Sequence, residues 1–105
     1  MKLINLVPYL KSFDSLEELY KLNNLDIKSE AIIIYMEETL AIESEIVFFE
    51  IEETKDNLTY KKNGINYIQL FPVNYAMEII EDLLGFGYDE LEIAQRLLEY
   101  RIKDG

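Results

Sequence analysis

The dipeptide Asn63-Gly64 restricts the fold of this chain more than any other feature, because it separates two β-prone segments by only two residues. The segment before it reads NLTYK and continues through Lys62, and the segment after it reads INYIQL. A two-residue type I′ turn needs a positive φ at both central residues, and Asn-Gly is the pair that best tolerates this conformation. We therefore predict a hairpin in which Tyr60 and Tyr67 lie opposite each other on one face.

Two further strands are predicted before this hairpin. The run AIIIYM, residues 31–36, is continuously apolar and rich in isoleucine, which is typical of a central strand that is covered on both faces. The segment EIVFFEI, residues 45–51, has the composition of a second strand and is framed by charge.

Two short helices are predicted at the N-terminal end of the chain. The first covers residues 5–13, with Pro8 in its first turn, where the missing N–H costs little. The second covers residues 15–24 and starts at a capping box formed by Ser15 and Glu18.

Two longer helices are predicted at the C-terminal end. Pro72 is expected to open the first of them, and Gly85 is expected to help end it. The second begins at a capping box of Asp89 and Glu92. One face of this last helix is predicted to carry its apolar side chains, which are Leu91, Ala94, Leu98 and Ile102.

This order of elements predicts the α+β class. We expect a small antiparallel or mixed sheet of about four strands, with the two short N-terminal helices and the two C-terminal helices packed on it. A length of 105 residues suits one domain, residues 1–105, and half of the residues are apolar, which is enough for a core.

The sequence lacks the residue types that several classes of enzyme and metal site require. The chain has no histidine and no cysteine, so it has no Ser-His or Cys-His nucleophile and none of the usual zinc ligands. Glu50 and Glu52 would share one face of the predicted strand, roughly 7 Å apart by strand rise, whereas a retaining glycosidase needs about 5–5.5 Å. We therefore expect no enzyme, no cofactor and no metal site.

The location of the protein is predicted from what the sequence lacks. The absence of cysteine fits a reducing cytosol. The N-terminal segment has no cleavage site of a secretory signal, and no apolar stretch is long enough to cross a bilayer. A cytoplasmic protein without a membrane partner is expected.

The charge of the chain is strongly acidic and unevenly distributed. Its net charge is −11, which repels nucleic acid and attracts basic proteins. Residues 37–53 hold seven glutamates and no lysine or arginine. We predict that a basic partner contacts this cluster and two nearby residues of the last helix: Glu37, Glu38, Glu43, Glu45, Glu50, Glu52, Glu53, Asp89 and Glu90.

The chain resembles the small acidic immunity proteins that bacteria encode beside secreted or contact-delivered toxins, and most of all those of contact-dependent growth inhibition. The local likeness lies in NGINYIQLFPVNYAMEIIEDLL and EIAQRLLEYRIKDG, a hairpin followed by two closing helices. The resemblance implies a monomer that inhibits one basic toxin domain, often a nuclease, in a one-to-one complex. These families share no functional motif, so no residue role is carried over.

Two other interpretations remain open. An acidic mimic of nucleic acid would block a DNA-binding or defence protein, and its carboxylates would cover much of the surface. An acidic regulatory domain would carry its charge for solubility alone. Lys61 and Lys62 at the hairpin tip are interpreted as a solvated turn, not as a nucleic-acid site.

Overall fold

A four-stranded antiparallel sheet with the strand order β2-β1-β4-β3 forms the centre of the fold. The computed structural model describes residues 1–25 and 31–104. The strands are β1 (Ile32–Glu37), β2 (Ile46–Glu50), β3 (Thr59–Lys62) and β4 (Ile65–Pro72). The α+β prediction is confirmed, and every strand pair is antiparallel, so the sheet is not mixed.

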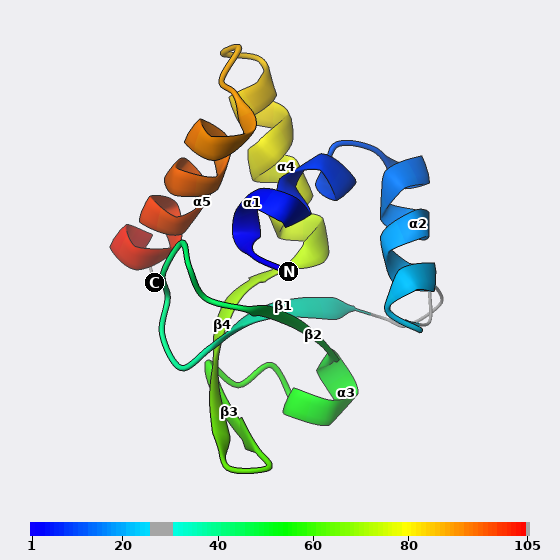
Figure 1. The fold of residues 1–105 in the computed structure, drawn as a ribbon, viewed down its shortest axis with the longest axis vertical. Helices are drawn as coiled ribbons and strands as arrows, with labels where there is room; N and C mark the ends of the chain where they lie inside the picture. Colours follow the sequence, from blue (N-terminus) through cyan, green and yellow to red (C-terminus); the bar gives the residue numbers. More distant parts are fainter. Residues whose placement is uncertain (26–30, 105) are drawn as a thin grey trace.

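Helices gather on one side of this sheet. They are α1 (Leu3–Leu6), the 3-10 helix η1 (Val7–Leu10), α2 (Phe13–Leu22), α4 (Val73–Leu84) and α5 (Glu90–Asp104). Figure 1 shows these helices above the sheet, whereas the single turn α3 (Ile51–Thr54) lies below it, beside β2. None of the described helices is both long enough and apolar enough to cross a membrane.

The predicted hairpin is present. Asn63 and Gly64 adopt φ values of 53° and 80°, and both values lie in the left-handed region that a type I′ turn requires. Tyr60 pairs directly with Tyr67 across β3 and β4.

Alternate residues of β1 enter two different apolar clusters. Ile32, Ile34 and Met36 pack in the main core beneath the helices. Ile33 and Tyr35 point to the other face of the sheet, into a smaller cluster with Phe49 and Tyr67. The prediction that this strand is covered on both faces is therefore confirmed.

The smaller cluster closes because the sheet curls. Phe49 belongs to one edge strand and Tyr60 to the other, yet their ring centroids are 5.1 Å apart in an edge-to-face arrangement. The register between β1 and β4 shifts after Ile34, which leaves Leu70 as a bulge residue. A bulge increases local twist and bends the strand, and this brings the two edges toward each other.

Several element boundaries differ from the predictions. The first helix was predicted over residues 5–13, but the chain instead forms α1 from Leu3 and then the 3-10 helix η1, which ends at Leu10. The second helix begins at Phe13, and its cap is Ser12, whose Oγ accepts a hydrogen bond from the Ser15 N–H at 3.3 Å. Ser15 was therefore the wrong choice between two serines that are three residues apart. Pro72 ends β4 and precedes α4 as its N-cap, so it is not the first helical residue. The second strand was predicted to reach residue 51, but it stops at Glu50, and Ile51 is the first residue of α3.

The predicted buried face of the last helix was wrong in part. Ala94 is buried as expected, but Leu91 and Ile102 are 46% and 59% exposed. The other residues that the helix buries completely are Ile93 and Leu97. Both sets have helical spacing, so the sequence pattern left the rotation of this helix about its own axis undecided. One half of the predicted capping box is confirmed, because the Asp89 carboxylate accepts the Glu92 N–H at 2.8 Å. The Glu92 carboxylate accepts a hydrogen bond from Arg96 Nε at 3.0 Å.

Candidate functional site

The seven glutamates of residues 37–53 separate into two groups at opposite ends of β2. Glu37, Glu38, Glu43 and Glu45 belong to the end of β1 and to the loop that leads to β2. Glu50, Glu52 and Glu53 belong to the end of β2 and to α3. Four strand residues lie between Glu45 and Glu50, and the five steps between these two glutamates correspond to roughly 17 Å of strand rise.

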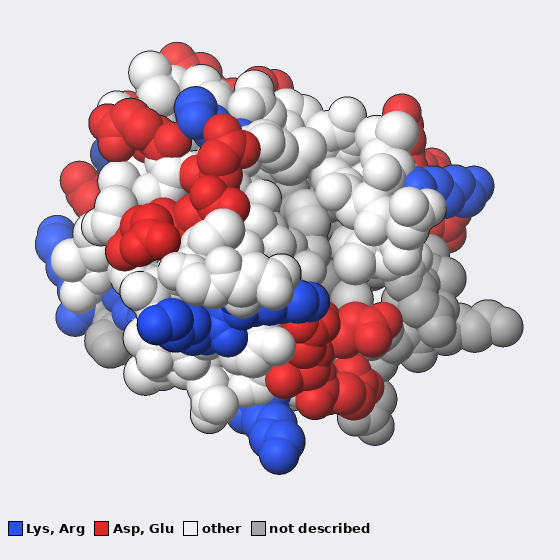
Figure 2. All heavy atoms as spheres, turned by 60° about the horizontal axis from the view of Figure 1, so that its bottom comes forward, with Lys and Arg blue, Asp and Glu red and all other residues white. Residues whose placement is uncertain are grey.

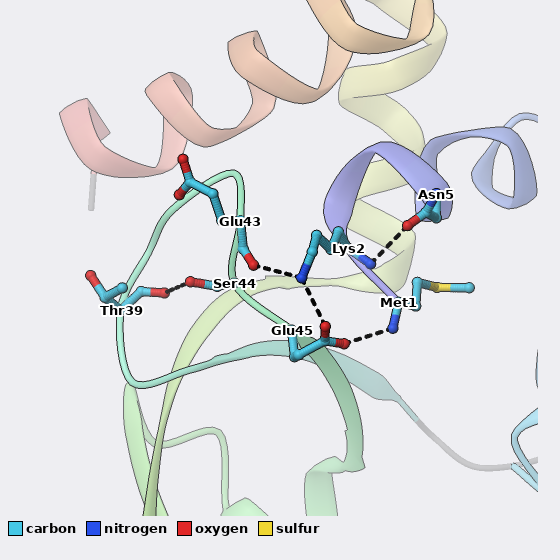
Figure 3. A network of polar contacts seen from close by, with 7 residues as sticks. All are labelled: Met1, Lys2, Asn5, Thr39, Glu43, Ser44 and Glu45. Carbon is cyan, nitrogen blue, oxygen red and sulfur yellow. Dashed lines mark hydrogen bonds and ion pairs between the residues drawn. The ribbon is translucent and has the colours of Figure 1, made fainter.

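Glu45 is held by cations from the start of the chain. One carboxylate oxygen accepts a hydrogen bond from Lys2 Nζ at 2.8 Å, and the other accepts one from the Met1 amino group at 2.8 Å (Figure 3). These bonds lower the pKa of Glu45 to about 2, with the Lys2 hydrogen bond as the largest cause and the amino group as the second. Glu45 therefore has an intrachain role that the sequence did not reveal.

The same contacts hold the loop in place. Lys2 Nζ also donates to the Glu43 carbonyl at 2.9 Å, and the Ser44 hydroxyl donates to the Thr39 carbonyl at 2.7 Å (Figure 3). The carboxylates of Glu38 and Glu43 are exposed on this loop, and Glu37 is half-buried at its start. Their backbone is fixed while their charges remain accessible to a partner.

Glu53 forms the second intrachain clamp. Its carboxylate accepts hydrogen bonds from Lys62 Nζ at 2.8 Å and from the Tyr60 hydroxyl at 2.9 Å. The hydrogen bond from Lys62 is the main reason why the pKa of Glu53 lies below its usual value. Lys62 Nζ also lies 5.5 Å from the ring centroid of Phe49. These contacts join α3 to β3 of the hairpin, beside the smaller apolar cluster.

Glu50 and Glu52 are arranged differently from the prediction. Glu50 is the half-buried last residue of β2, and Glu52 is exposed within α3, so the two side chains do not share the face of one strand. Glu50 and Glu52 therefore do not form the strand pair of carboxylates that was compared with a glycosidase site. Within residues 1–25 and 31–104, no cluster of three or more acidic side chains is suited to hold a metal ion.

Asp89 and Glu90 stand apart from both groups. They begin α5, which in Figure 1 starts at the top of the molecule, far from α3 at its lower end. Asp89 caps the helix, and Glu90 accepts a hydrogen bond from Lys11 Nζ at 3.3 Å. Both residues therefore make contacts within the chain, and neither lies beside the glutamates of α3.

Five glutamates of the stretch remain without an ion pair to any cation in the described part of the chain. They are Glu37, Glu38, Glu43, Glu50 and Glu52. Figure 2 shows one face of the molecule, on which acidic atoms form separate groups with basic and uncharged surface between them. The candidate site is therefore two acidic patches, which we call the loop patch (Glu37, Glu38 and Glu43) and the α3 patch (Glu50 and Glu52).

Sequence reasoning missed Lys2 and Lys62 as partners of this stretch. Lys2 lies 43 residues from Glu45, so only the tertiary structure brings them together. Lys62 had a visible signal, because alternation along the predicted hairpin strand places it on the same face as Tyr60.

Comparisons of the chain with protein-family models, curated proteins and solved structures found no match. The inference about function therefore depends on the geometry and charge described above.

Proposed function

We propose that this protein is an immunity protein, which binds and neutralises a toxin domain by covering its basic active site with the loop patch and the α3 patch. The observation that carries the proposal is that five glutamates around β2 have no cation among the described residues. An ionised carboxylate that lacks an internal partner is available for charge-assisted hydrogen bonds to lysine or arginine of another protein.

The physical advantage of such a surface is speed as well as affinity. A nuclease has a basic active site because it must attract phosphates. The same positive potential attracts an acidic inhibitor. Charge complementarity of this kind raises association rates to about 10⁸–10⁹ M⁻¹s⁻¹ at low salt. The inhibitor acts in the cytoplasm as a monomer in a one-to-one complex and has no catalytic activity of its own.

Rigid presentation of the patches supports the proposal. The clamps on Glu45 and Glu53 fix the loop and α3 without neutralising Glu38, Glu43 or Glu52. Fixed groups lose less conformational entropy on binding than groups on a mobile loop. The paired glutamates therefore serve the fold, and the unpaired ones are the binding residues.

The first experiment is co-expression with the C-terminal domain of the protein encoded immediately upstream of this chain. We expect that this domain alone arrests growth and that co-expression of the chain restores it. A toxic domain that remains toxic and does not bind the purified chain would contradict the proposal.

The second experiment tests the patches by charge reversal. Glu38→Lys with Glu52→Lys changes one exposed glutamate in each patch, and Glu17→Lys with Glu18→Lys makes the same charge change on the exposed face of α2. Association of the first variant with the toxin domain should slow by at least about tenfold at low salt and by less at ~0.15 M salt. Equal slowing of both folded variants would mean that net charge alone matters and that the patches are not the interface.

The interpretation as a nucleic-acid mimic has less support. It requires carboxylates spread over the surface in the manner of a phosphate backbone, whereas ion pairs with Lys2, Lys11, Lys62 and Arg96 interrupt the acidic surface. Binding to several unrelated DNA-binding proteins would favour the mimic over a dedicated inhibitor.

A further inference from the structure

An open cleft of about 640 Å³ lies on the helical side of the molecule, between α4 and the junction of η1 with α2. Its walls combine apolar and acidic side chains, among them Leu10, Phe13, Met77, Leu84, Glu78 and Glu81. Phe13 is 76% exposed, although it lies three residues before the buried Leu16, at the spacing of one helix face. Leu84 is also 37% exposed, so the cleft presents large apolar side chains to water.

The charges of α4 are placed unfavourably for the helix itself. Glu81 and Asp82 lie in its last turn, which contains no basic residue, although the C-terminal end of a helix dipole favours positive charge. The helices α2 and α5 follow the favourable rule, because Lys21 lies in the last turn of α2 and Arg101 in the last turn of α5. The acidic end of α4 is therefore not explained by helix stability.

No described cation neutralises this acidic wall. Among the residues described, Glu78 and Glu81 of the cleft lining make no ion pair, and neither does Asp82 beside them. Lys11 also lines the cleft, but its Nζ is directed to Glu90 Oε1, 3.3 Å away on α5. The cleft thus combines exposed apolar surface with a negative wall and with the negative end of the α4 dipole.

We propose that this cleft binds a short segment of a partner protein in which a large apolar side chain is flanked by lysine or arginine. The apolar side chain packs against Phe13 and Leu84, and the flanking cations meet Glu78 and Glu81. Charge complementarity selects this occupant over a second copy of the chain, since each copy carries a net charge of −11 and the same acidic wall. None of the glutamates of residues 37–53 lines the cleft, so this inference does not rest on the proposed function.

The test uses three synthetic peptides as probes. KKLFKK carries both features of the proposed segment, KKGSKK keeps the charge without the apolar pair, and EELFEE keeps the apolar pair with the opposite charge. Titrations are followed in amide NMR spectra of the intact chain. We expect KKLFKK to cause its largest shifts at residues of the cleft wall and to bind at least about tenfold more tightly than either control peptide.

Matched variants identify the contacts. Phe13→Ala should weaken binding of KKLFKK by about tenfold because it removes apolar surface from the interface. Phe86→Ala removes the same side chain at a site of similar exposure, 73%, outside the cleft lining, and should leave binding unchanged. Glu78→Gln with Glu81→Gln should weaken it by about threefold to tenfold and reduce its salt dependence.

Several results would overturn the proposal. One is the absence of saturable shifts in the cleft, and another is equal binding of EELFEE and KKLFKK. Largest shifts at residues 37–53 would also overturn it, although they would leave the proposed function standing. A dimer of the free protein that disappears in Phe13→Ala, as measured by sedimentation, would show that a second copy occupies the cleft.

Discussion

Replacement of Tyr35 by phenylalanine should measure how firmly the segment after α3 is tied to the sheet. Tyr35 is completely buried, and its hydroxyl donates a hydrogen bond to the Asn57 carbonyl. The Gln69 side-chain amide approaches the same hydroxyl at 3.4 Å and donates a shorter bond, 3.0 Å, to Asp56 Oδ1. The hydroxyl thus joins the middle of β1 to the connection between α3 and β3.

The expected loss follows from these contacts. A neutral hydrogen bond contributes about 0.5–1.5 kcal/mol to the free energy of unfolding, and a buried acceptor left without a donor costs about 1–3 kcal/mol. The Gln69 side-chain amide also lies 3.4 Å from the Asn57 carbonyl, so this acceptor keeps a donor after the substitution and the lower part of these ranges applies. We expect a loss of about 1.5 kcal/mol, which corresponds to a decrease in Tm of about 6–12 °C for a domain of this size.

The assay is urea unfolding followed by circular dichroism, with Tyr67→Phe as the matched control. Tyr67 is 8% exposed on the same face of the sheet, and its hydroxyl makes no hydrogen bond to a described residue. The control should therefore lose less than about 0.5 kcal/mol. Equal losses for the two variants at an unchanged m-value would refute the assignment of a specific bond to Tyr35.

Three further predictions concern the fold. Gly64→Ala should cost about 1 kcal/mol in urea unfolding, because Gly64 has a φ of 80° that a residue with a Cβ adopts at a penalty; an unchanged midpoint would contradict the turn assignment. Ile93→Ala should cost about 2–5 kcal/mol and Leu91→Ala less than about 1 kcal/mol, because only Ile93 is buried; the reverse order would show that the helix is rotated. The pKa of Glu45 is lowered to about 2 in the folded state, so its ion pairs stabilise the fold above the unfolded pKa, and this contribution is lost as the pH falls toward 2. Glu45→Gln should therefore lose less stability than the unaltered chain between pH 4.5 and 2, as measured by urea midpoints, and equal losses would contradict the clamp.

Local patterns were sufficient to predict much of the architecture. The turn at Asn63-Gly64 depends on the φ preferences of two adjacent residues, and the cap at Asp89 depends on atoms three residues apart. The continuous apolar run of β1 likewise predicted burial on both faces. Turns and helix caps are determined by a few neighbouring residues, so the sequence alone contains the information needed to predict them.

The candidate site was less predictable, because charge in a sequence says nothing about which cation lies beside it. The glutamates of residues 37–53 form one cluster along the chain but two patches in space, at opposite ends of β2. Glu45 and Glu53 differ from their neighbours only because Lys2 and Lys62 reach them. The cleft beside α4 was missed for a related reason, since its walls come from segments about 60 residues apart.

The sequence by itself determined the class of fold, the hairpin, the approximate positions of the four predicted helices, and the large excess of negative charge. Only the tertiary structure decided the curl of the sheet, the rotation of α5 and the division of the glutamates into paired and unpaired residues. The physical reason is the range of the interactions. Turn geometry and helix capping act between neighbouring residues, whereas the contact between Phe49 and Tyr60 and the ion pair of Lys2 with Glu45 require the whole chain to fold first.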